Sequence, residues 1–448
     1  MAGSWRRDHE PGDLQHRPIL AHQGPPGSGR PAAVALCRVG SVAAMGELVV
    51  PIDVVGLGAD GAPGVSEAAR SALLAADVVI GSERQLALLP DDVGAERVAL
   101  PRPLLPGLGD LLDGADGRRI VVLASGDPSW HGIGSTLVRL VGPGAVRTHP
   151  APSTLSLACA RLGWPAEHVT TVSLLTGPAA SIIAALQPGR HLLVLLAAAA
   201  DLPGVADLLC RNGFGASALT LLADLGAHDE TVRTGTARMP PMPTGRLTAV
   251  AIDCAAEPGA TWWPSGPGLP DEAFEHDGQL TKRDLRASAL ARLAPAPGQL
   301  LWDVGAGAGS VGIEWMRHGP TCRTIAVERH AERAERLGRN ASRLGVPGLQ
   351  VVVGPAPDVL TGLDRPDAVF VGGGATSAGL LDACWAALAP GGRLVVHAVT
   401  AESEAALVGQ RSTRGGELVR IGVEHLEPLG GFSGWRPARA VTQWAVTR

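Results

Sequence analysis

Short apolar runs alternate with helical patterns over most of this chain, and this alternation is the feature that most restricts its fold. The alternation runs from Val49 to about Asp253 and resumes at Leu269. Strands that alternate with helices favour sheets covered by helices on both faces. At roughly 150 residues a domain, a chain of 448 residues has room for two or three such domains. We therefore expect an α/β protein built from two α/β units.

Composition changes divide the chain into four segments. Residues 1–46 hold clustered Pro, Gly, Arg and His without a sustained apolar period, which predicts a disordered tail, with Met45 as an alternative start. Residues 47–255 are expected to form the first unit, and its Gly- and Pro-rich middle near residues 143–152 predicts two lobes. Residues 256–268 are expected to be a linker, and residues 269–448 the second unit.

The second unit predicts a doubly wound sheet. Thr281 stands three residues before Asp284, a variant of the capping-box spacing, so a helix is expected to start there with Leu285, Ala289 and Leu293 on one face. The strands expected after it cover residues 300–304, 324–328, 349–353, 368–371 and 393–399, with helices at 310–317, 330–344 and 377–388. Two terminal strands near 417–427 and 440–446 are expected to pair as an antiparallel hairpin.

Charge and hydropathy exclude several classes of partner. The 38 basic and 43 acidic residues give a formal net charge of −5, so no nucleic-acid partner is expected. The longest uncharged apolar run, residues 192–200, is far shorter than the roughly 20 residues of a membrane-spanning helix, and the N-terminus lacks a signal-peptide core. We expect a cytoplasmic protein with no membrane partner that forms a homo-oligomer.

Two residue types restrict the chemistry. The six cysteines follow no C-x-x-C or Cys/His zinc spacing, so neither a disulfide framework nor a bound metal is expected. Of the 38 basic residues only Lys282 is a lysine, which excludes a P-loop. Because a guanidinium does not replace a compact ammonium, Lys282 is a candidate catalytic residue, with an ordinary solvated lysine as the alternative.

A glycine loop follows the strand expected at residues 300–304 and opens the next helix. Its G-x-G-x-G spacing fits a dinucleotide fingerprint poorly, because the third glycine of G-x-G-x-x-G would fall on Ser310. The carboxylates before the loop and at the end of the next strand suit S-adenosylmethionine: Glu328 can accept both ribose hydroxyls, and Asp303 can order the loop or lie near the positive end of the cofactor. We favour a cofactor site over glycines that serve a tight turn. Its expected residues are Asp303, Gly305, Ala306, Gly307, Ala308, Gly309 and Glu328.

The motifs of the second unit resemble those of the decarboxylating precorrin methyltransferases of cobalamin biosynthesis. The resemblance covers essentially all of residues 269–448, and its motifs lie at residues 269–274, 280–286, 301–313, 354–357 and 366–374. It implies a Rossmann-like class I methyltransferase domain. In that family the residues equivalent to Thr281, the glycine loop, Glu328 and Ala356 contact S-adenosylmethionine.

The first unit carries its own glycine loop, Val-Val-Gly-Leu-Gly-Ala-Asp-Gly at residues 54–61, and Ser66 is expected to cap the following helix. Further motifs lie at residues 123–128, 131–134, 151–154 and 162–165. In this order they resemble the tetrapyrrole methylases, over about residues 50–255. The resemblance implies a two-lobed fold that holds S-adenosylmethionine largely by backbone groups. The expected cofactor-binding residues are Gly56, Gly58, Gly61, Gly126, Asp127, Pro128, Ser153 and Thr154; His131 is interpreted as a packed or loop histidine rather than a base.

Together the two units resemble the fused precorrin-6Y C(5,15)-methyltransferases (decarboxylating). The resemblance implies methylation of meso carbons 5 and 15 of a tetrapyrrole, with loss of CO2 from the ring-carbon-12 acetate in the C-terminal half. Catalysis would come from positioning and from excluding water, without a metal. Fixed cations would bind the substrate carboxylates, and those available are Lys282, Arg283, Arg286, Arg436 and Arg439.

Two other interpretations stay open at this point. A class I methyltransferase acting on RNA or protein would also use the C-terminal glycine loop, although the acidic balance and the absence of tyrosine disfavour RNA. A non-catalytic sensor of tetrapyrrole or cofactor would keep both pockets for binding alone. Transfer of a labelled methyl group to a precorrin, compared with bulk tRNA, separates these interpretations.

Overall fold

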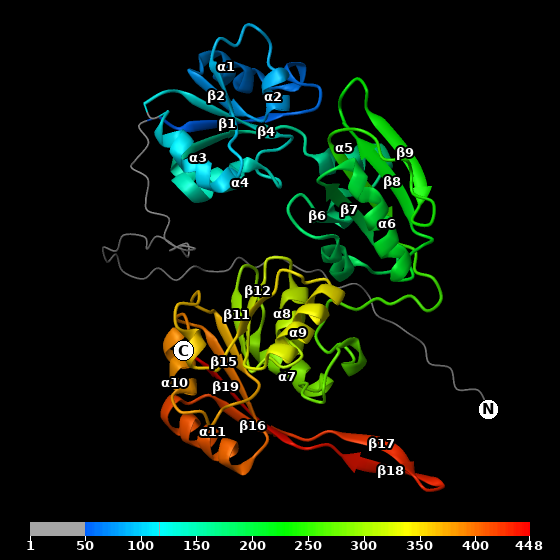
Figure 1. Cartoon of the computed structure of the whole chain (residues 1–448), viewed down its shortest axis with the longest axis vertical. Helices are drawn as coiled ribbons and strands as arrows, with labels where there is room; N and C mark the ends of the chain where they lie inside the picture. The colour runs from blue at the N-terminus through cyan, green and yellow to red at the C-terminus, as the bar shows by residue number, and fades with distance from the viewer. Residues whose placement is uncertain (1–49, 116) are drawn as a thin grey trace, which may run out of the picture. The chain divides into compact units, whose positions relative to one another are not determined.

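A computed structural model describes residues 50–115 and 117–448 of the chain (Figure 1). The predicted tail at residues 1–46 and the alternative start at Met45 lie outside these residues. The described residues form sheets of five, five and seven strands and a separate two-stranded sheet. The α/β class expected from the alternating pattern is confirmed.

The first sheet is parallel, with strand order β3-β2-β4-β1-β5. Alternate residues of its strands face opposite sides: Val54 packs with α3 and α4, and Val55 packs with α1. Ser66 caps α1 by accepting a hydrogen bond from the backbone N–H of Ala69, as predicted. The elements are β1 (Ile52–Leu57), α1 (Glu67–Ala75), β2 (Val78–Gly81), α2 (Glu83–Ala87), β3 (Glu96–Ala99), α3 (Leu104–Asp113), β4 (Ile120–Ser125), α4 (Ile133–Val141) and β5 (Val146–His149).

The second sheet has the order β6-β7-β10-β8-β9, and within it only β6 and β7 run parallel. Ala158 of α5 packs on one face of this sheet and Val205 of α6 on the other. The two sheets are the two lobes that the Gly- and Pro-rich segment near residues 143–152 predicted. The elements are α5 (Thr154–Leu162), β6 (Val169–Ser173), β7 (His191–Leu196), α6 (Leu202–Arg211), β8 (Ala218–Ala223), β9 (Thr231–Thr236) and β10 (Thr248–Asp253).

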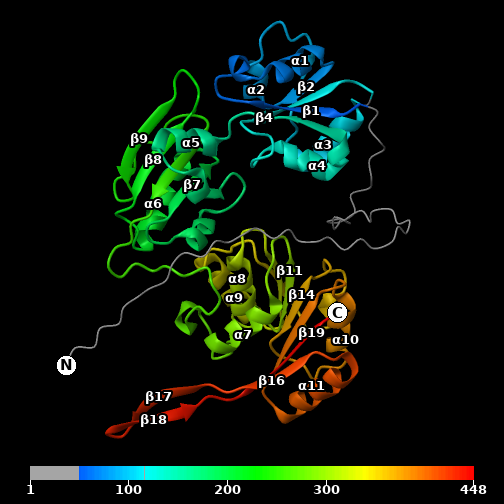
Figure 2. The ribbon, with the colours of Figure 1, turned by 180° about the vertical axis from the view of Figure 1, so that it is seen from behind.

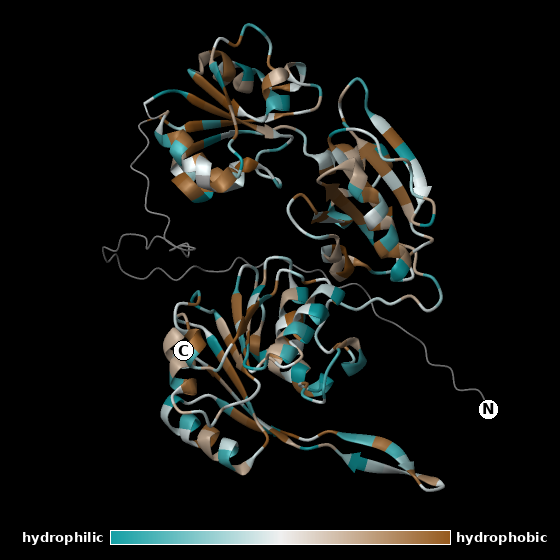
Figure 3. Cartoon of the chain, in the orientation of Figure 1, coloured by the Kyte–Doolittle hydropathy of each residue, from teal (hydrophilic) through white to brown (hydrophobic). Residues whose placement is uncertain are grey.

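The seven-stranded sheet has the order β13-β12-β11-β14-β15-β19-β16, with β19 antiparallel to both of its neighbours. Its elements are α7 (Arg283–Leu293), β11 (Leu300–Val304), α8 (Ser310–His318), β12 (Arg323–Glu328), α9 (Ala331–Arg343), β13 (Gln350–Val353), β14 (Ala368–Val371), α10 (Leu380–Ala387), β15 (Arg393–Ala398), α11 (Ala401–Arg414), β16 (Glu417–Ile421) and β19 (Val441–Thr447). Helices α7, α8 and α9 cover one face and α10 and α11 the other (Figures 1 and 2). Strands covered on both faces are expected to be continuously apolar. All four residues of β14 are apolar and buried, and β11 and β15 are mostly brown in Figure 3.

The terminal strands differ from the prediction. One strand was expected near residues 417–427, but the chain leaves the sheet after β16 and forms the hairpin of β17 (Glu424–Leu429) and β18 (Phe432–Pro437) before it returns as β19. This hairpin extends beyond the sheet in both views (Figures 1 and 2). The Gly430-Gly431 pair between its strands is a hairpin signal that the sequence interpretation overlooked. The predicted antiparallel pairing is confirmed for β16 with β19.

The start of α7 also differs by one residue. Lys282 rather than Thr281 occupies the N-cap position, and no side-chain hydrogen bond caps the helix. The predicted inner face is confirmed, because Leu285, Ala289 and Leu293 are all buried. None of the helices in the described part of the chain combines the length and the apolar character that crossing a bilayer would need.

Candidate active site

The carboxyl ends of β11, β12, β13 and β14 lie at one edge of the seven-stranded sheet. The strand order reverses between β11 and β14, and in open α/β sheets ligands bind in the crevice at such a point. Two glycine segments approach each other there: a Cβ atom on Gly305 would lie only 3.3 Å from the backbone nitrogen of Gly373. The sequence therefore brings two backbone loops to the place where the topology leaves a crevice.

A cavity of about 860 Å³ opens at this edge. Its volume falls within the range of about 300–1,000 Å³ that is usual for cofactor and small-molecule sites. Of the predicted residues of the C-terminal site, those that line the cavity are Thr281, Lys282, Gly305, Ala306, Gly307, Glu328 and Ala356. Segments that are far apart in the sequence thus meet in one place.

Glu328 ends β12 and is 4% exposed. One of its carboxylate oxygens accepts the backbone N–H of Gly307 at 2.9 Å, and the other accepts the backbone N–H of His330 at 3.0 Å. A carboxylate oxygen has two acceptor positions, so each oxygen keeps capacity for one further donor. Glu328 therefore both fixes the glycine loop and offers two acceptors to a ligand in the cavity.

Three predicted residues are not among those that line the cavity: Asp303, Ala308 and Gly309. The buried Asp303 carboxylate accepts the backbone N–H of Gly312 at 2.9 Å and so stabilises the first turn of α8. Burial raises the pKa of Asp303 to about 7, and the nearby Glu328 charge acts in the same direction. Asp303 therefore fixes the start of the helix that follows the glycine loop, a role close to the predicted ordering of the loop.

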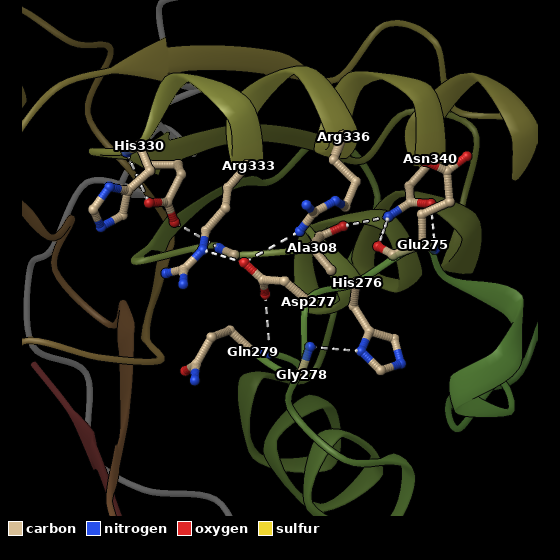
Figure 4. Close-up of polar contacts among 12 residues, drawn as sticks. Glu275, His276, Asp277, Gly278, Gln279, Ala308, His330, Arg333, Arg336 and Asn340 are labelled. Carbon is tan, nitrogen blue, oxygen red and sulfur yellow. Dashed lines mark hydrogen bonds and ion pairs between the residues drawn. The ribbon is translucent and has the colours of Figure 1, made fainter.

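A segment that the sequence interpretation did not single out, residues 275–279, passes over the glycine loop and is held by α9 (Figure 4). Asp277 forms ion pairs with Arg333 at 2.8 Å and Arg336 at 3.3 Å, and these arginines hold the pKa of Asp277 well below its usual range. The buried Asn340 donates to the backbone carbonyls of Glu275 and Ala308. These ion pairs and hydrogen bonds thus hold residues 275–279, the segment that leads to Thr281, against α9.

The prediction that Arg286 binds a substrate carboxylate is wrong. Its side chain is completely buried and pairs with Glu314 at 2.5 Å and Asp271 at 3.3 Å. It also donates to the backbone carbonyls of Thr281 and Leu269. Because all of these partners are internal, Arg286 fixes the segment before α7 and is not available to a ligand.

The other candidate cations have different surroundings. Lys282 lines the cavity with its Nζ 3.3 Å from a carboxylate oxygen of Asp271, and Arg439 also lines the cavity. Arg436 forms an ion pair with Glu427 on the β17–β18 hairpin, and Arg283 is exposed. The structure therefore leaves Lys282 and Arg439 as the predicted cations at the site.

Further polar residues of the cavity were missed by sequence reasoning. The cationic and histidine residues among them are Arg329, His330, Arg333, His397 and His425. Position at a strand end is a signal that could have found some of them, since Arg329 and His330 directly follow β12 and His397 lies next to the end of β15. His425 belongs to the overlooked hairpin and carried no such signal.

The predicted N-terminal residues lie at the carboxyl ends of β1, β4 and β5, which are neighbours in the first sheet. Gly56 allows these ends to meet, because a Cβ atom there would lie 2.6 Å from the carbonyl oxygen of Gly126 and 2.8 Å from Cβ of Ala151. The backbone N–H of Gly126 donates to the carbonyl of Leu57 at 3.0 Å. The structure thus brings together the first glycine loop, Gly126 and the segment that leads to Ser153.

Several of these residues also have local structural roles. Ser153 caps α5 through the backbone N–H of Ser156, and Asp127 accepts the backbone N–H of Ser129 at 2.7 Å. Gly58 and Gly61 close a turn through a backbone hydrogen bond of 3.3 Å. A ligand at this edge would therefore meet mainly backbone groups, together with the neighbouring Pro128 and Thr154.

His131 packs edge-on against Trp130, with ring centroids 4.8 Å apart. Burial lowers the pKa of His131, which favours its neutral form. His131 is nevertheless exposed, so of the two interpretations, a packed or a loop histidine, the structure agrees with a loop histidine.

Comparison with known proteins connects both halves to one pathway. A precorrin methyltransferase domain matches residues 272–448, and the tetrapyrrole (corrin/porphyrin) methylases match residues 52–240. The precorrin-6Y C(5,15)-methyltransferase (decarboxylating) of Mycobacterium tuberculosis is 46% identical over 401 residues, which span 89% of this chain and 100% of that protein. The protein of the same name from Sinorhizobium sp. is 44% identical over 398 residues, 89% of this chain and 96% of the relative.

A solved structure, the C-terminal domain of precorrin-6Y C5,15-methyltransferase from Rhodobacter capsulatus, is 45% identical to this chain. It covers 42% of this chain and 100% of its own, with a TM-score of 0.40.

Proposed function

Because this chain belongs to the family of precorrin-6Y C(5,15)-methyltransferases (decarboxylating), we propose that it methylates precorrin-6Y at carbons 5 and 15 and removes CO2 from the ring-carbon-12 acetate. The observation that carries the assignment of the C-terminal half is the cavity in which Thr281, the glycine loop, Glu328 and Ala356 meet. The relatives described above are named for a precorrin, not for an RNA or protein acceptor. A pure sensor is disfavoured because these relatives are named as enzymes.

We propose that S-adenosylmethionine is the methyl donor, and the residues present fit it. The Glu328 carboxylate keeps acceptor capacity on both oxygens, which suits the two ribose hydroxyls. Gly307 lets the glycine loop approach the segment before Thr281 closely, because a Cβ atom there would lie 3.0 Å from the carbonyl oxygen of Gln279. Backbone groups of residues 305–307, together with Thr281 and Ala356, would complete the contacts. When bound, this cofactor supplies a methyl group that is already activated as a sulfonium.

The residues of the cavity then have to position the substrate and exclude water. Lys282 is the proposed catalytic residue, whose ammonium binds a substrate carboxylate at the mouth of the cavity, with Arg439 as a second fixed cation. Asp271 holds Lys282 by an ion pair of 3.3 Å, and Arg286 holds Asp271 in turn. The buried Arg286 pair therefore places the lysine without contacting the substrate.

In the N-terminal half we propose a second S-adenosylmethionine site at the carboxyl ends of β1, β4 and β5. Its support is the meeting of the glycine loop, Gly126 and the segment before Ser153, together with the tetrapyrrole methylase match over residues 52–240. The side chains of Ser153 and Asp127 are engaged locally, so the cofactor would be held largely by backbone groups. This half would add the methyl group that is not accompanied by loss of CO2.

We further propose that the chain forms a homo-oligomer through the β17–β18 hairpin. An isolated two-stranded hairpin is marginally stable in water, and both of its outer edges offer unpaired backbone groups. Phe432 is 84% exposed and Trp435 is 68% exposed, with Leu426 and Leu429 also exposed. A second copy presents the same apolar side chains and the same free edges, so the hairpin suits self-association.

The test of the proposed function is methyl transfer by the full chain. Incubation with precorrin-6Y and isotope-labelled S-adenosylmethionine should label the tetrapyrrole and release CO2, whereas bulk tRNA under the same conditions should stay unlabelled. Labelled tRNA with unlabelled precorrin would favour the nucleic-acid alternative. Binding of both ligands without transfer would favour the sensor.

A further inference from the structure

His397 lines the same cavity as the predicted cofactor residues but comes from a different part of the sheet. It lies in β15 next to the strand end, is 8% exposed, and packs edge-on against Phe370 with ring centroids 5.0 Å apart. Directly opposite it on β19 stands Gln443, which is completely buried. The ring of His397 is thus held between the cavity and a buried amide.

The orientation of the Gln443 amide follows from its other neighbour, Arg292 of α7. A guanidinium can only donate hydrogen bonds, so the amide atom that faces it has to be the oxygen. In this orientation the oxygen accepts from Arg292 Nε at 3.0 Å and from Arg292 Nη1 at 3.1 Å. In the reverse orientation the amide nitrogen of Gln443 would donate to Ser288 Oγ at 3.3 Å. The amide N–H groups would then face the N–H groups of Arg292. A carboxylate oxygen of Glu417 also accepts from Arg292 Nε, at 2.7 Å, so the single Nε–H is shared between Glu417 and Gln443.

The amide nitrogen of Gln443 then lies 2.8 Å from His397 Nε2 and donates to it. An imidazole nitrogen that accepts a hydrogen bond carries no proton, so the proton of a neutral ring has to sit on Nδ1. Burial lowers the pKa of His397 and the Arg292 charge lowers it further, which favours the neutral ring. Nδ1 has no hydrogen-bond partner within residues 50–115 and 117–448, so its proton is free to serve a ligand.

This arrangement determines which chemistry His397 can perform. It cannot act as a base, because the lone pair of Nε2 is occupied by the Gln443 amide. It is a poor acid, because a neutral ring that lost its Nδ1 proton would become an imidazolate. What remains is a neutral N–H donor with a fixed direction.

We propose that His397 is a substrate-binding residue of the C-terminal reaction, which donates a hydrogen bond from Nδ1–H to a carboxylate oxygen of the tetrapyrrole. The inference rests on the proposed function of this cavity. The series Glu417, Arg292, Gln443 and His397 fixes the proton on Nδ1, the ring nitrogen that Gln443 does not engage, so Gln443 and Arg292 are positioning residues. A neutral donor orients a carboxylate without the strong ion pair that would stabilise it against loss of CO2.

The tautomer can be measured without any substrate. Two-bond ¹H–¹⁵N correlation spectra of the full chain labelled with ¹⁵N-histidine, at neutral pH, should show His397 neutral with its proton on Nδ1, and the signal is assigned by its loss in His397→Asn. In Gln443→Glu the new carboxylate accepts from Nε2–H, so the proton should move to Nε2. A wild-type ring protonated on Nε2, or on both nitrogens, would overturn the proposal.

Kinetics of three variants test the role in binding. Asn places an N–H donor near the position of Nδ1 but performs no acid or base chemistry, so His397→Asn should keep KM for precorrin-6Y within about threefold. His397→Leu and Gln443→Glu should raise KM about tenfold, as expected for one lost hydrogen bond to a charged group. All three should bind S-adenosylmethionine with unchanged Kd, and His318→Asn, at the exposed end of α8, is the matched control.

These measurements separate the proposed function from the donor role of His397. No turnover of precorrin-6Y by the wild-type chain would contradict the proposed function itself. Wild-type turnover with His397→Asn as defective as His397→Leu would overturn the donor role alone.

Discussion

The carboxylate of Glu328 accepts the backbone N–H of Gly307 in a hydrogen bond of 2.9 Å, which ties the glycine loop to the end of the neighbouring strand. The other oxygen of the same carboxylate holds the backbone N–H of His330 at 3.0 Å. One buried side chain therefore shapes the backbone that borders the cavity and also offers acceptors to what binds there.

Replacing Glu328 should weaken cofactor binding in the C-terminal half. Loss of a doubly hydrogen-bonded carboxylate costs about 2 to 3 kcal/mol, roughly 30-fold or more in affinity. Titration calorimetry of Glu328→Ala with S-adenosylmethionine measures this. The control is Glu332→Ala, on the exposed side of the first turn of α9. Unchanged affinity at the C-terminal site would reject the assignment of Glu328 to the ribose.

Lys282→Arg should lower the C-terminal activity although it keeps the positive charge. The ammonium of Lys282 is held 3.3 Å from Asp271 at the cavity, and a planar guanidinium does not fit the same geometry. We expect a severalfold lower kcat/KM for precorrin-6Y, with cofactor Kd unchanged. The matched control is Arg283→Lys at the exposed neighbouring position. Wild-type kinetics in Lys282→Arg would identify Lys282 as an ordinary solvated lysine.

Asp303 should make the stability of the chain depend on pH. Its pKa is raised to about 7 in the folded state, compared with the model-peptide value of about 3.9. Between these two pH values the folded state binds a proton that the unfolded state has lost. The contribution of Asp303 to the free energy of unfolding therefore falls as pH rises, and it is constant above about pH 7. The Tm of Asp303→Asn minus that of the wild type should therefore increase from about pH 4 to about pH 7. A difference that does not change with pH would contradict the burial argument.

The β17–β18 hairpin should carry self-association. Phe432→Ser combined with Trp435→Ser removes its two most exposed aromatic side chains. Sedimentation velocity should show a smaller assembly for the double variant than for the wild type at equal concentration. Arg436→Ser, which replaces a polar residue of the same hairpin, is the control. Identical sedimentation of wild type and double variant would exclude the hairpin as the interface.

The sequence predicted the fold where hydrophobic pattern and local signals agree. The strands at residues 300–304 and 368–371 were placed to the residue, because parallel strands covered on both faces are continuously apolar. The β17–β18 hairpin was missed because its side chains are largely exposed and show no buried face. The start of α7 was shifted by one residue because no side chain caps it.

The candidate site was predicted in part for similar reasons. Loop glycines and a strand-end carboxylate are visible in sequence, and Gly305, Gly307 and Glu328 do line the cavity. The difference between Arg286 and Arg439 depends on tertiary contacts, since Arg286 pairs with the buried Glu314 and Arg439 lies at the cavity. The Gln443–His397 pair joins residues that are neighbours only through the pairing of β15 with β19, which no local pattern reveals.

In the proposed function, the C-terminal cavity performs both methylation and loss of CO2. Mass spectrometry of the precorrin-6Y product tests this division of labour, with the full chain as wild type and as Glu328→Ala. The wild type should yield a product with two added methyl groups and one CO2 lost. With S-adenosylmethionine well below the weakened Kd of the variant, Glu328→Ala should yield mainly the product with one added methyl group, from the N-terminal half, and little loss of CO2. A Glu328→Ala product that has lost CO2 and gained both methyl groups at the wild-type rate would contradict the account.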